Sequence, residues 1–352
     1  MRKRYDTIEW KGVAKTNKEI TIKDVAKQAG VSVATVSRVM NGRDRVSEAT
    51  RKKILKIIEE MNFVPNTMAA SMVNKKTNML SVVVPEIQNP FYTAVIGGMV
   101  EVAKKEGFTT LVVATNSDEA EEEEFFESFL GKNVDGIILI GTHKDAEFYR
   151  NIRKPTILVD RYINDCGHDG VLIDNFRGAY EATKHFVEYG HERIAIIDGA
   201  HDFNDGKDRY WGYRQAMHES GLTPDPAYHK QGNWLEEDGY RFTTELMQSG
   251  QPPTAIFAAN NVICTGAIKA IRDLNLRIGE DISLIGFDDN ELAQFVQPRV
   301  TVVSRPTREM GIQAAEMLIQ KIKGEPKEQT KLKKMILDVE LKKFGSVKKL
   351  KA

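Results

Sequence analysis

The chain has 352 residues and is neutral, with 50 basic and 50 acidic residues. No apolar run approaches the length of a membrane-spanning helix, which excludes a membrane-embedded protein. The two cysteines, Cys166 and Cys264, lie far apart and lack the spacing of a metal or redox motif, so neither a disulfide nor a metal is implied. Two unpaired cysteines suit a reducing cytoplasm, where we expect the protein to act.

The first 19 residues lack the apolar central region of a signal peptide. We expect residues 1–19 to be a disordered extension, or the product of a translation start assigned upstream of the native one.

Residues 20–65 carry the pattern of three short helices. Thr21 can cap a first helix, Gly30 permits a tight turn, and Ser32 can cap a second helix over residues 33–40. Ser47 begins a third helix, whose expected buried side consists of Ile54, Leu55, Ile57, Ile58 and Met61. Two helices joined by a short turn with glycine indicate a helix-turn-helix, which places the start of its second helix in the major groove of DNA.

The charge distribution agrees with a DNA-binding head. Residues 1–77 hold 17 Lys or Arg against 8 Asp or Glu, a net charge of +9, and residues 78–352 hold 33 against 42, a net charge of −9. A basic N-terminal region next to an acidic remainder is typical of a module that binds DNA phosphates, joined to a domain whose negative charge is repelled by DNA. The alternative is a solvated helical domain with a chance excess of lysine.

The remaining chain alternates β-rich apolar runs with helical stretches, which predicts buried parallel sheets. We therefore expect an α/β fold with two doubly wound lobes behind the all-α head. The predicted strands are Leu80–Val84, Thr110–Ala114, Gly136–Ile140, Thr156–Val159, Val171–Ile173, Ile194–Ile197, Ala255–Ala258 and Ile282–Ile285.

Side chains suited to a sugar follow several of these strands, where open α/β sheets bind ligands. Asp, Asn and Arg can bridge adjacent hydroxyls with two hydrogen bonds, while an aromatic ring covers the C–H face of a sugar. Asp160 and Asp288 could instead cap helices or turns, and Trp234 or Phe91 could simply be core. The candidates are Phe91, Tyr92, Asp160, Arg209 (expected to open a helix), Trp234, Asn260 and Asp288.

Catalytic motifs are missing from the sequence. It contains no Gly-x-Ser-x-Gly elbow, no P-loop and no His-Glu-x-x-His, and its seven histidines show no ligand spacing. We expect no catalytic residues, no metal and no cofactor. The acidic run over residues 119–127 reads as the solvated face of a helix.

Five motifs occur in the order found in the lactose and galactose repressor family, and the resemblance runs from Ile20 to about Val339. It identifies the chain as similar to that family of bacterial transcription regulators. The motifs are Thr21-Ile22-Lys23-Asp24-Val25-Ala26, Gly30-Val31-Ser32, Thr35-Val36-Ser37-Arg38-Val39, Val46-Ser47 with Thr50-Arg51, and Pro65-Asn66 with Ala69.

The resemblance implies roles for residues of the head. Val33, Ala34 and Arg38 match base-reading positions, and the fork of Arg38 suits the acceptors of guanine. A hinge over residues 66–77 is implied to fold on DNA, with Met72, where the family usually has Leu, as a minor-groove wedge. Its alternative is a plain linker with a stray Met. The matched phosphate-binding positions are Ser32, Thr35, Ser37 and Asn41.

The resemblance also implies an effector-binding and dimerisation core over residues 78–345. Its architecture resembles periplasmic sugar-binding proteins, and the chain is implied to cross between the lobes near residues 174, 304 and 335. The seven ligand candidates match effector-contact positions. Two positions depart from the family pattern: Arg305 replaces the usual Gln, suggesting an anionic effector, and Asn261 replaces the usual Asp.

We therefore expect a cytoplasmic transcription repressor that binds a near-palindromic DNA operator as a homodimer. A small sugar or sugar derivative between the lobes would control it. Our first choice is an inducer that releases the DNA, and the second is a corepressor that tightens DNA binding. The lysine-rich tail from Lys331 has no leucine heptads, so no tetramer is expected. The alternatives are a sugar-binding protein or enzyme on the same core, and a regulator controlled by a phosphoprotein partner.

Overall fold

The computed structural model describes residues 20–40, 46–61, 63, 77–130, 133–324 and 332–350. The chain forms two compact units, residues 1–77 and residues 78–352, and each is described by itself. The predictions for residues 1–19, for Asn41 and for the hinge with Met72 lie outside the described residues. Within the described residues, no helix is long and apolar enough to cross a membrane.

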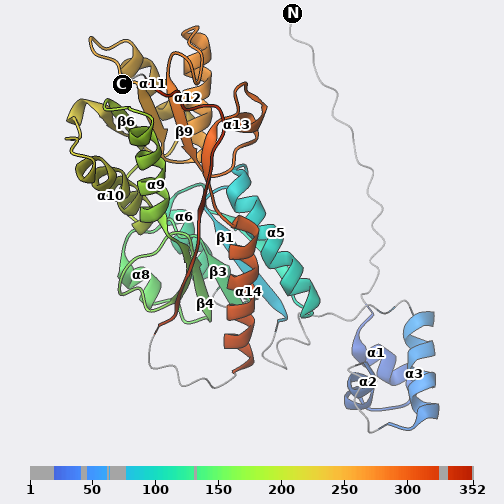
Figure 1. Ribbon diagram of the computed structural model, residues 1–352. Helices are drawn as coiled ribbons and strands as arrows, with labels where there is room; N and C mark the ends of the chain where they lie inside the picture. Colours follow the sequence, from blue (N-terminus) through green and yellow to red (C-terminus); the bar gives the residue numbers. More distant parts are fainter. Residues whose placement is uncertain are drawn as a thin grey trace, which may run out of the picture. The chain divides into compact units, whose positions relative to one another are not determined.

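The first unit contains α1 (Ile22–Ala29), α2 (Val33–Met40) and α3 (Glu48–Glu60) (Figure 1). Gly30 turns the chain between α1 and α2 with a left-handed φ of 67°, which glycine adopts without strain. Leu55 was expected on the buried side of α3 but is 49% exposed, because the buried Ile54 and Ile57 direct it outward. The apolar core consists of Val25, Ala26, Ala29, Val36, Val39, Ile54, Ile57 and Phe63.

Side-chain caps fix where the three helices begin. The Ser32 hydroxyl accepts from the backbone N–H of Thr35 at 3.1 Å, and Ser47 accepts from Thr50 in the same way at 3.3 Å. At α1 the side chain of the third helical residue makes the bonds: the Asp24 carboxylate accepts from the backbone N–H of the N-cap residue Thr21 (2.9 Å) and from its hydroxyl (2.7 Å). These N-terminal hydrogen bonds fix the residue at which each short helix begins.

The second unit contains two six-stranded sheets, which we call lobe 1 and lobe 2. The sheet of lobe 1 has the order β11-β5-β4-β3-β1-β2 and is parallel throughout. The elements of lobe 1 are β1 (Met79–Val84), α5 (Pro90–Lys105), β2 (Thr109–Ala114), α6 (Glu119–Phe125), the π-helix η1 (Phe126–Leu130), β3 (Gly136–Leu139), α8 (Ala146–Arg150), β4 (Thr156–Val159), β5 (Asp169–Ile173), α14 (Thr307–Lys323) and β11 (Lys334–Leu337).

The sheet of lobe 2 has the order β12-β10-β9-β8-β6-β7, with only the β10–β12 pair antiparallel. The α/β fold class with two parallel-dominated lobes is thus confirmed. The elements of lobe 2 are α9 (Asn175–Glu188), β6 (Ile194–Asp198), α10 (Asn204–Glu219), the 3₁₀ helix η2 (Pro226–Tyr228), β7 (His229–Gln231), α11 (Glu236–Met247), β8 (Ala255–Ala258), α12 (Asn261–Asp273), β9 (Ser283–Phe287), α13 (Glu291–Phe295), β10 (Thr301–Ser304) and β12 (Glu340–Lys342).

The chain passes between the lobes three times: from β5 to α9, from β10 to α14, and from β11 to β12. Helix α14 therefore returns to lobe 1, where Gly311 and Gly98 let it approach α5 closely. A Cβ on Gly311 would lie 2.0 Å from the Val95 carbonyl oxygen, too close for any other residue. In Figure 1 the red C-terminal segment runs along both lobes.

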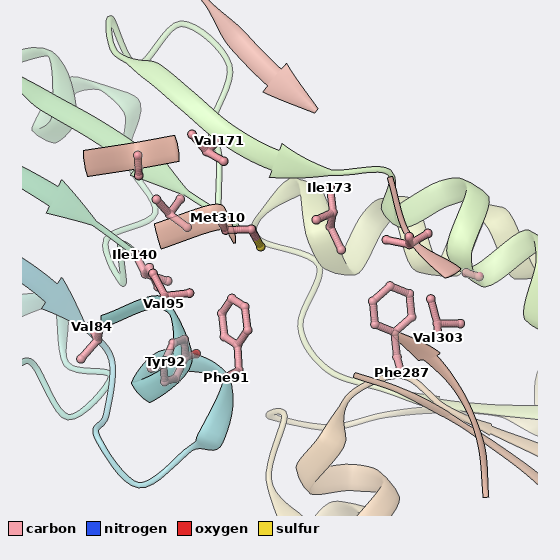
Figure 2. Close-up of a cluster of buried hydrophobic side chains, with 14 of the residues drawn as sticks. Val84, Phe91, Tyr92, Val95, Ile140, Val171, Ile173, Phe287, Val303 and Met310 are labelled. Atoms are coloured by element: carbon pink, nitrogen blue, oxygen red, sulfur yellow. The ribbon is translucent and has the colours of Figure 1, made fainter. Parts of the chain in front are cut away.

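One hydrophobic cluster continues from lobe 1 into lobe 2. Figure 2 shows Phe91 and Tyr92 at the start of α5, with Phe287 and Val303 of lobe 2 in the same cluster. Because the buried residues of both sheets belong to one cluster, the two lobes share part of their core at the place where the predicted ligand residues lie.

The C-terminal segment packs on lobe 2 past residue 345. Ser346 is buried and its hydroxyl donates to the Leu284 carbonyl at 2.6 Å. The buried His191 joins this segment through Nε2, which donates to the Lys348 carbonyl at 2.9 Å, while its Nδ1 lies 2.9 Å from the Thr254 hydroxyl. Burial lowers the pKa of His191 to about 4.

This lowered pKa predicts a loss of stability in acid. In the unfolded chain His191 is protonated as the pH falls below its ordinary pKa of about 6.5, whereas in the folded chain it is protonated only near pH 4. Stability from this group is therefore complete above about pH 6.5 and is lost as the pH falls towards 4. At about pH 4.5 the loss should reach roughly 2–3 kcal/mol.

Urea unfolding of wild type and His191→Gln at about pH 7 and pH 4.5 measures this loss. The variant should lose less stability between the two pH values than wild type does. His218→Gln, at an exposed site, is the matched control and should behave like wild type. An equal pH dependence in wild type and His191→Gln would contradict the prediction.

Candidate nucleic-acid interface and ligand site

Helix α2 separates a buried face from an exposed one. Val36 and Val39 are buried in the core of the first unit, whereas Val33 is 40% exposed and Ala34 and Arg38 are also exposed. At 3.6 residues per turn these three exposed positions lie on one side of the helix. The predicted base-reading residues therefore share a surface that is free of core contacts.

The predicted phosphate-binding residues on α2 are partly engaged within the protein. The hydroxyls of Ser32 and Thr35 lie 2.9 Å apart, in addition to the Ser32 cap. A hydroxyl has one donor and two acceptor positions, so capping does not exclude a phosphate contact. Ser37 is half-buried on α2.

In the second unit the structure brings Phe91, Asp160, Asp288 and Arg305 together at the lobe interface. Arg305, in the passage from β10 to α14, donates to Asp160 of lobe 1 at 2.5 Å and to Asp288 of lobe 2 at 2.8 Å. The guanidinium carbon lies 3.6 Å from the centre of the Phe91 ring. Since the two carboxylates and Arg305 are all buried, this is an ion-paired connection between the lobes.

Arg209 forms a second group of contacts next to the first. Its Nε donates to the Asn175 side-chain oxygen at 2.8 Å, and its Nη1 donates to the Ala259 carbonyl at 2.7 Å. The guanidinium carbon lies 3.9 Å from the centre of the Phe287 ring and 5.8 Å from that of Trp234. The Arg209 side chain is thus fixed in position by four neighbours.

Two buried donors in this group are left without a partner among the described residues: Nη2 of Arg209 and Nδ2 of Asn175. Both residues are almost completely buried. A buried donor without an acceptor costs about 1–3 kcal/mol, so such groups are rare unless something else uses them. Each atom therefore has a free donor that an oxygen atom of a ligand could use.

Three predicted ligand residues have left-handed backbones. The φ angles are 65° at Asp160, 65° at Trp234 and 74° at Asp288. Left-handed backbone is uncommon for residues other than glycine and costs most for a bulky side chain such as Trp. The Trp234 ring lies over Gly199, where a Cβ would meet ring atoms at 2.3 Å. Strain of this kind is concentrated at functional sites.

Burial and ion pairing act on the titratable groups in opposite directions. Burial raises the pKa of Asp288, although Arg305 and Arg209 act to lower it. Burial lowers the pKa of Arg209. Burial also acts to lower the pKa of Arg305, but Asp160 and Asp288 outweigh it and the pKa is raised. Arg305 therefore stays charged and is neutralised by protein carboxylates.

The structure changes two interpretations from the sequence and adds a capping contact for a third residue. Arg305 is not a free positive charge for an anionic effector, because Asp160 and Asp288 occupy its donors. Asn260 caps α12 by accepting from the Ile263 N–H at 2.7 Å, and its role as a ligand residue stays a prediction. Arg209 does not open its helix, because α10 begins at Asn204.

Other contacts at the lobe interface were missed from the sequence. Asn261 of lobe 2 donates to Asn89 of lobe 1 at 2.8 Å, so the second departure from the family pattern forms a contact between the lobes. Arg161 donates to the Tyr92 hydroxyl at 3.4 Å, and Tyr92 itself is buried. Asn175 lies two residues after β5 ends at Ile173, where α9 begins, and this position near a strand end is the signal that could have found it.

A hollow of the surface elsewhere is not part of this site. It lies on lobe 1, between α6, η1 and α8, and is lined by residues such as Phe126, His143 and Phe148. The hollow contains none of the predicted ligand residues.

A helix-turn-helix unit together with a two-lobed α/β core, which has strained and unsatisfied polar groups in lobe 2 near the ion pairs that connect the lobes, defines a DNA-binding regulator of the effector-controlled class. Residues 21–66 match the family described as bacterial regulatory proteins, lacI family, and residues 183–337 match a periplasmic binding protein-like domain.

Relatives extend this match over most of the chain. The transcriptional regulator DegA of Bacillus subtilis (strain 168) is 39% identical over 297 residues, which cover 83% of this chain and 88% of DegA. The lac repressor dimer bound to operator and the anti-inducer ONPF matches with a TM-score of 0.82 and 25% identity over 94% of this chain and 99% of that one. The transcriptional regulator CelR in complex with cellobiose matches with a TM-score of 0.71 and 30% identity over 93% and 99% of the two chains.

The chain therefore belongs to the LacI family of bacterial regulatory proteins, and it is a DNA-binding transcription regulator. The alternative of an enzyme on the same core is set aside, because the relatives that match both the head and the core are transcription regulators.

Proposed function

We propose that the protein is a repressor that binds a near-palindromic operator as a homodimer and is controlled by a neutral sugar or sugar derivative held between its lobes. The observation that carries the effector part is the pair of unsatisfied buried donors, Nη2 of Arg209 and Nδ2 of Asn175, beside two aromatic rings. A cytoplasmic location follows from action on chromosomal DNA.

The exposed face of α2 supports the DNA part of the proposal. Arg38 would read guanine through its two-pronged guanidinium, while the short Val33 and Ala34 would allow close approach or contact thymine methyl groups. Ser32, Thr35 and Ser37 would hold phosphates from the same helix. Asn41 and Met72 keep the roles that the family resemblance implies for them.

The chemistry of the lobe interface favours a neutral polyol over an anion. The negative charges of Asp160 and Asp288 balance the positive charges of Arg305 and Arg209. These four groups therefore leave no net positive charge to attract a carboxylate or phosphate. Hydroxyl oxygens would accept from the unsatisfied donors, and the rings of Trp234 and Phe91 would pack against the C–H face. The neutral sugar cellobiose in the CelR complex is consistent with this choice.

Control would act through the contacts between the lobes. Besides the Arg305 ion pairs, Tyr162 of lobe 1 donates its backbone N–H to Asn204 of lobe 2 at 2.7 Å, and Lys144 pairs with Asp202 at 3.3 Å. A ligand that changes these few contacts would shift the angle between the lobes, and so the spacing of the two heads in a dimer. Release of DNA by the sugar is the expected direction.

Operator capture tests the DNA part. Purified protein is mixed with genomic fragments at physiological salt, and the retained fragments are sequenced. We expect a palindromic consensus and an affinity that falls steeply with salt. Addition of neutral sugars one at a time should release the captured fragment for at least one of them. Release by a phosphoprotein, with no response to any sugar, would replace the effector proposal but leave the DNA proposal standing.

Asn175→Asp tests the effector site itself. The change keeps the size of the side chain and an oxygen for Arg209 Nε, but it removes the donor Nδ2. The affinity for the sugar identified by thermal shift should fall about 5- to 100-fold, the equivalent of about 1–3 kcal/mol for an unsatisfied buried acceptor. The free energy of unfolding without ligand should be unchanged or higher, because the new carboxylate faces Arg209.

Asn275→Asp is the matched control, because Asn275 is exposed in the loop that follows α12. It should leave sugar affinity unchanged. Full affinity in Asn175→Asp would place the ligand elsewhere.

A further inference from the structure

Two histidines and a carboxylate meet at one end of the sheet in lobe 2. Asp198 is the last residue of β6, and its side chain is completely buried. The Nε2 atom of His201 lies 2.8 Å from one carboxylate oxygen, and the Nε2 atom of His229 lies 3.1 Å from the other. One ligand atom from each residue can be chosen so that all three lie within 4.8 Å of one another.

Distinct parts of the fold place these residues. Asp198 ends β6, His229 begins the neighbouring strand β7, and His201 lies in the loop between β6 and α10. The ring of Tyr210, on α10, stacks on His229 with centroids 4.4 Å apart and lies 5.1 Å from His201. The side chains of the two histidines are 22% and 24% exposed, so an ion can reach them from solvent.

The donor set suits a transition metal. Imidazole nitrogens with one carboxylate oxygen are ligands that zinc binds at about 2.0–2.2 Å, and three protein ligands leave the fourth position for water. A tetrahedral zinc site with such bonds separates its ligand atoms by roughly 3.3 Å. The separations of 2.8 and 3.1 Å run to different oxygens of the Asp198 carboxylate. With one oxygen chosen as the ligand, all three ligand atoms lie within 4.8 Å of one another, so side-chain shifts of about 1–2 Å would bring them to the tetrahedral separation.

We propose that Asp198, His201 and His229 form a binding site for one divalent transition-metal ion, with zinc as the best-matched metal. Binding would replace the hydrogen bonds between the carboxylate and the imidazoles by bonds to the ion. The simpler alternative is that the two histidines only satisfy a buried carboxylate, and the two readings differ in their response to metal. The metal site does not depend on the proposed sugar effector.

The site would stiffen a segment that contacts the other lobe. Ala200, next to His201, accepts a hydrogen bond from Trp234 Nε1 at 3.1 Å. The same segment contains Asp202 and Asn204, which pair with Lys144 and with the backbone of Tyr162 in lobe 1. A metal bound here would therefore act close to Trp234 and to the lobe interface, as a second ligand of the regulator.

The test uses the full chain, free of any histidine tag and stripped with a chelator. Zinc at about 100 times its dissociation constant should raise the Tm of the core by about 5 °C. Cobalt(II) titration should give visible d–d absorption that saturates at one ion per chain. His201→Ala and His229→Ala should each abolish both responses, whereas His218→Ala, at an exposed position on α10, should retain them.

Absence of both responses in wild type would overturn the proposal. Responses in His201→Ala and His229→Ala that equal those of wild type would also overturn it. Far-UV circular dichroism and the metal-free Tm of each variant check that it is folded. If an alanine variant is unfolded, His201→Gln, which keeps a polar side chain of similar length without the imidazole, takes its place. The cobalt spectrum of wild type remains decisive, since a stoichiometry other than one ion per chain contradicts the proposal.

Discussion

Arg38→Ala is expected to reduce strongly the discrimination between the operator and random DNA. Arg38 is exposed on the same side of α2 as Val33 and Ala34, so its removal should leave the core of the head intact. Loss of a two-pronged contact with guanine costs about 1–3 kcal/mol in each half-site, so a dimer should lose about 2–6 kcal/mol. Fluorescence anisotropy with the captured operator and a scrambled duplex, at one fixed salt concentration, measures both affinities.

Lys56→Ala provides the control for charge alone. Lys56 is exposed on α3, where it pairs with Glu60 at 3.7 Å. Its removal should leave the ratio of specific to non-specific affinity unchanged. If Arg38→Ala lowers the two affinities by the same factor, Arg38 contacts phosphate and not a base, and the assignment of the base-reading face is wrong.

Arg305→Gln is expected to destabilise the core by about 3–5 kcal/mol at neutral pH, although it introduces the residue usual in the family. The change leaves two buried carboxylates, Asp160 and Asp288, without the cation that pairs with both. Glutamine can donate to one oxygen but supplies no charge. Urea unfolding followed by the signal of the core gives the free energy of unfolding.

Acid should reduce this penalty. Burial already raises the pKa of Asp288, and loss of Arg305 removes a charge that lowers it, so the pKa rises further in the variant. A carboxyl group whose folded pKa exceeds its unfolded value destabilises the fold at high pH, and that destabilisation disappears as the pH falls through the folded pKa. The gap between wild type and Arg305→Gln should therefore be smaller at about pH 5 than at pH 7.

Arg308→Gln is the matched control two residues into α14. Arg308 pairs with Glu101 on α5, but both side chains are more than half exposed. Water screens such a pair, so the variant should lose no more than about 1 kcal/mol and show no comparable pH effect. An equally small loss in Arg305→Gln would mean that the ion pairs between the lobes contribute little.

Seven of the eight sheet strands predicted from the sequence are buried, and the eighth, β2, is an edge strand with exposed positions. All eight predicted strands are present, because continuous apolar runs such as Ile194–Ile197 have no other stable position than a covered sheet. Three of the missed strands, β7, β11 and β12, are short or lie at edges: β7 is the polar His229–Gln231, and β11 alternates exposed with half-buried residues. The fourth, β10, is fully buried but was missed because only Val302 and Val303 of its four residues are apolar. Edge strands carry less of the hydrophobic signal, and their pairing is decided by contacts distant in sequence.

The positions of the candidate ligand residues in the fold could be predicted from the sequence, but the bonds between them could not. Strand ends located Asp160 and Asp288, yet nothing local indicated that Arg305, 145 and 17 residues away from them, would neutralise both. Glu122 shows the same limit. It lies in the acidic run expected to be solvated, but it is buried and accepts from the Thr142 backbone N–H at 2.6 Å. Helical periodicity does not reveal a polar group that a distant loop satisfies.

The passage of the chain between the lobes has a consequence for the order in which the protein is made. Lobe 2 is nearly contiguous, since residues 175–304 contain all its elements except β12. Lobe 1 begins earlier but lacks α14, whose buried Met310, Ala314 and Leu318 belong to its core, until lobe 2 has been translated. Chains fold as they leave the ribosome. We therefore expect the sheet and helices of lobe 2 to pack first, although lobe 1 begins earlier in the sequence, because lobe 1 can complete its core only after α14 has been translated.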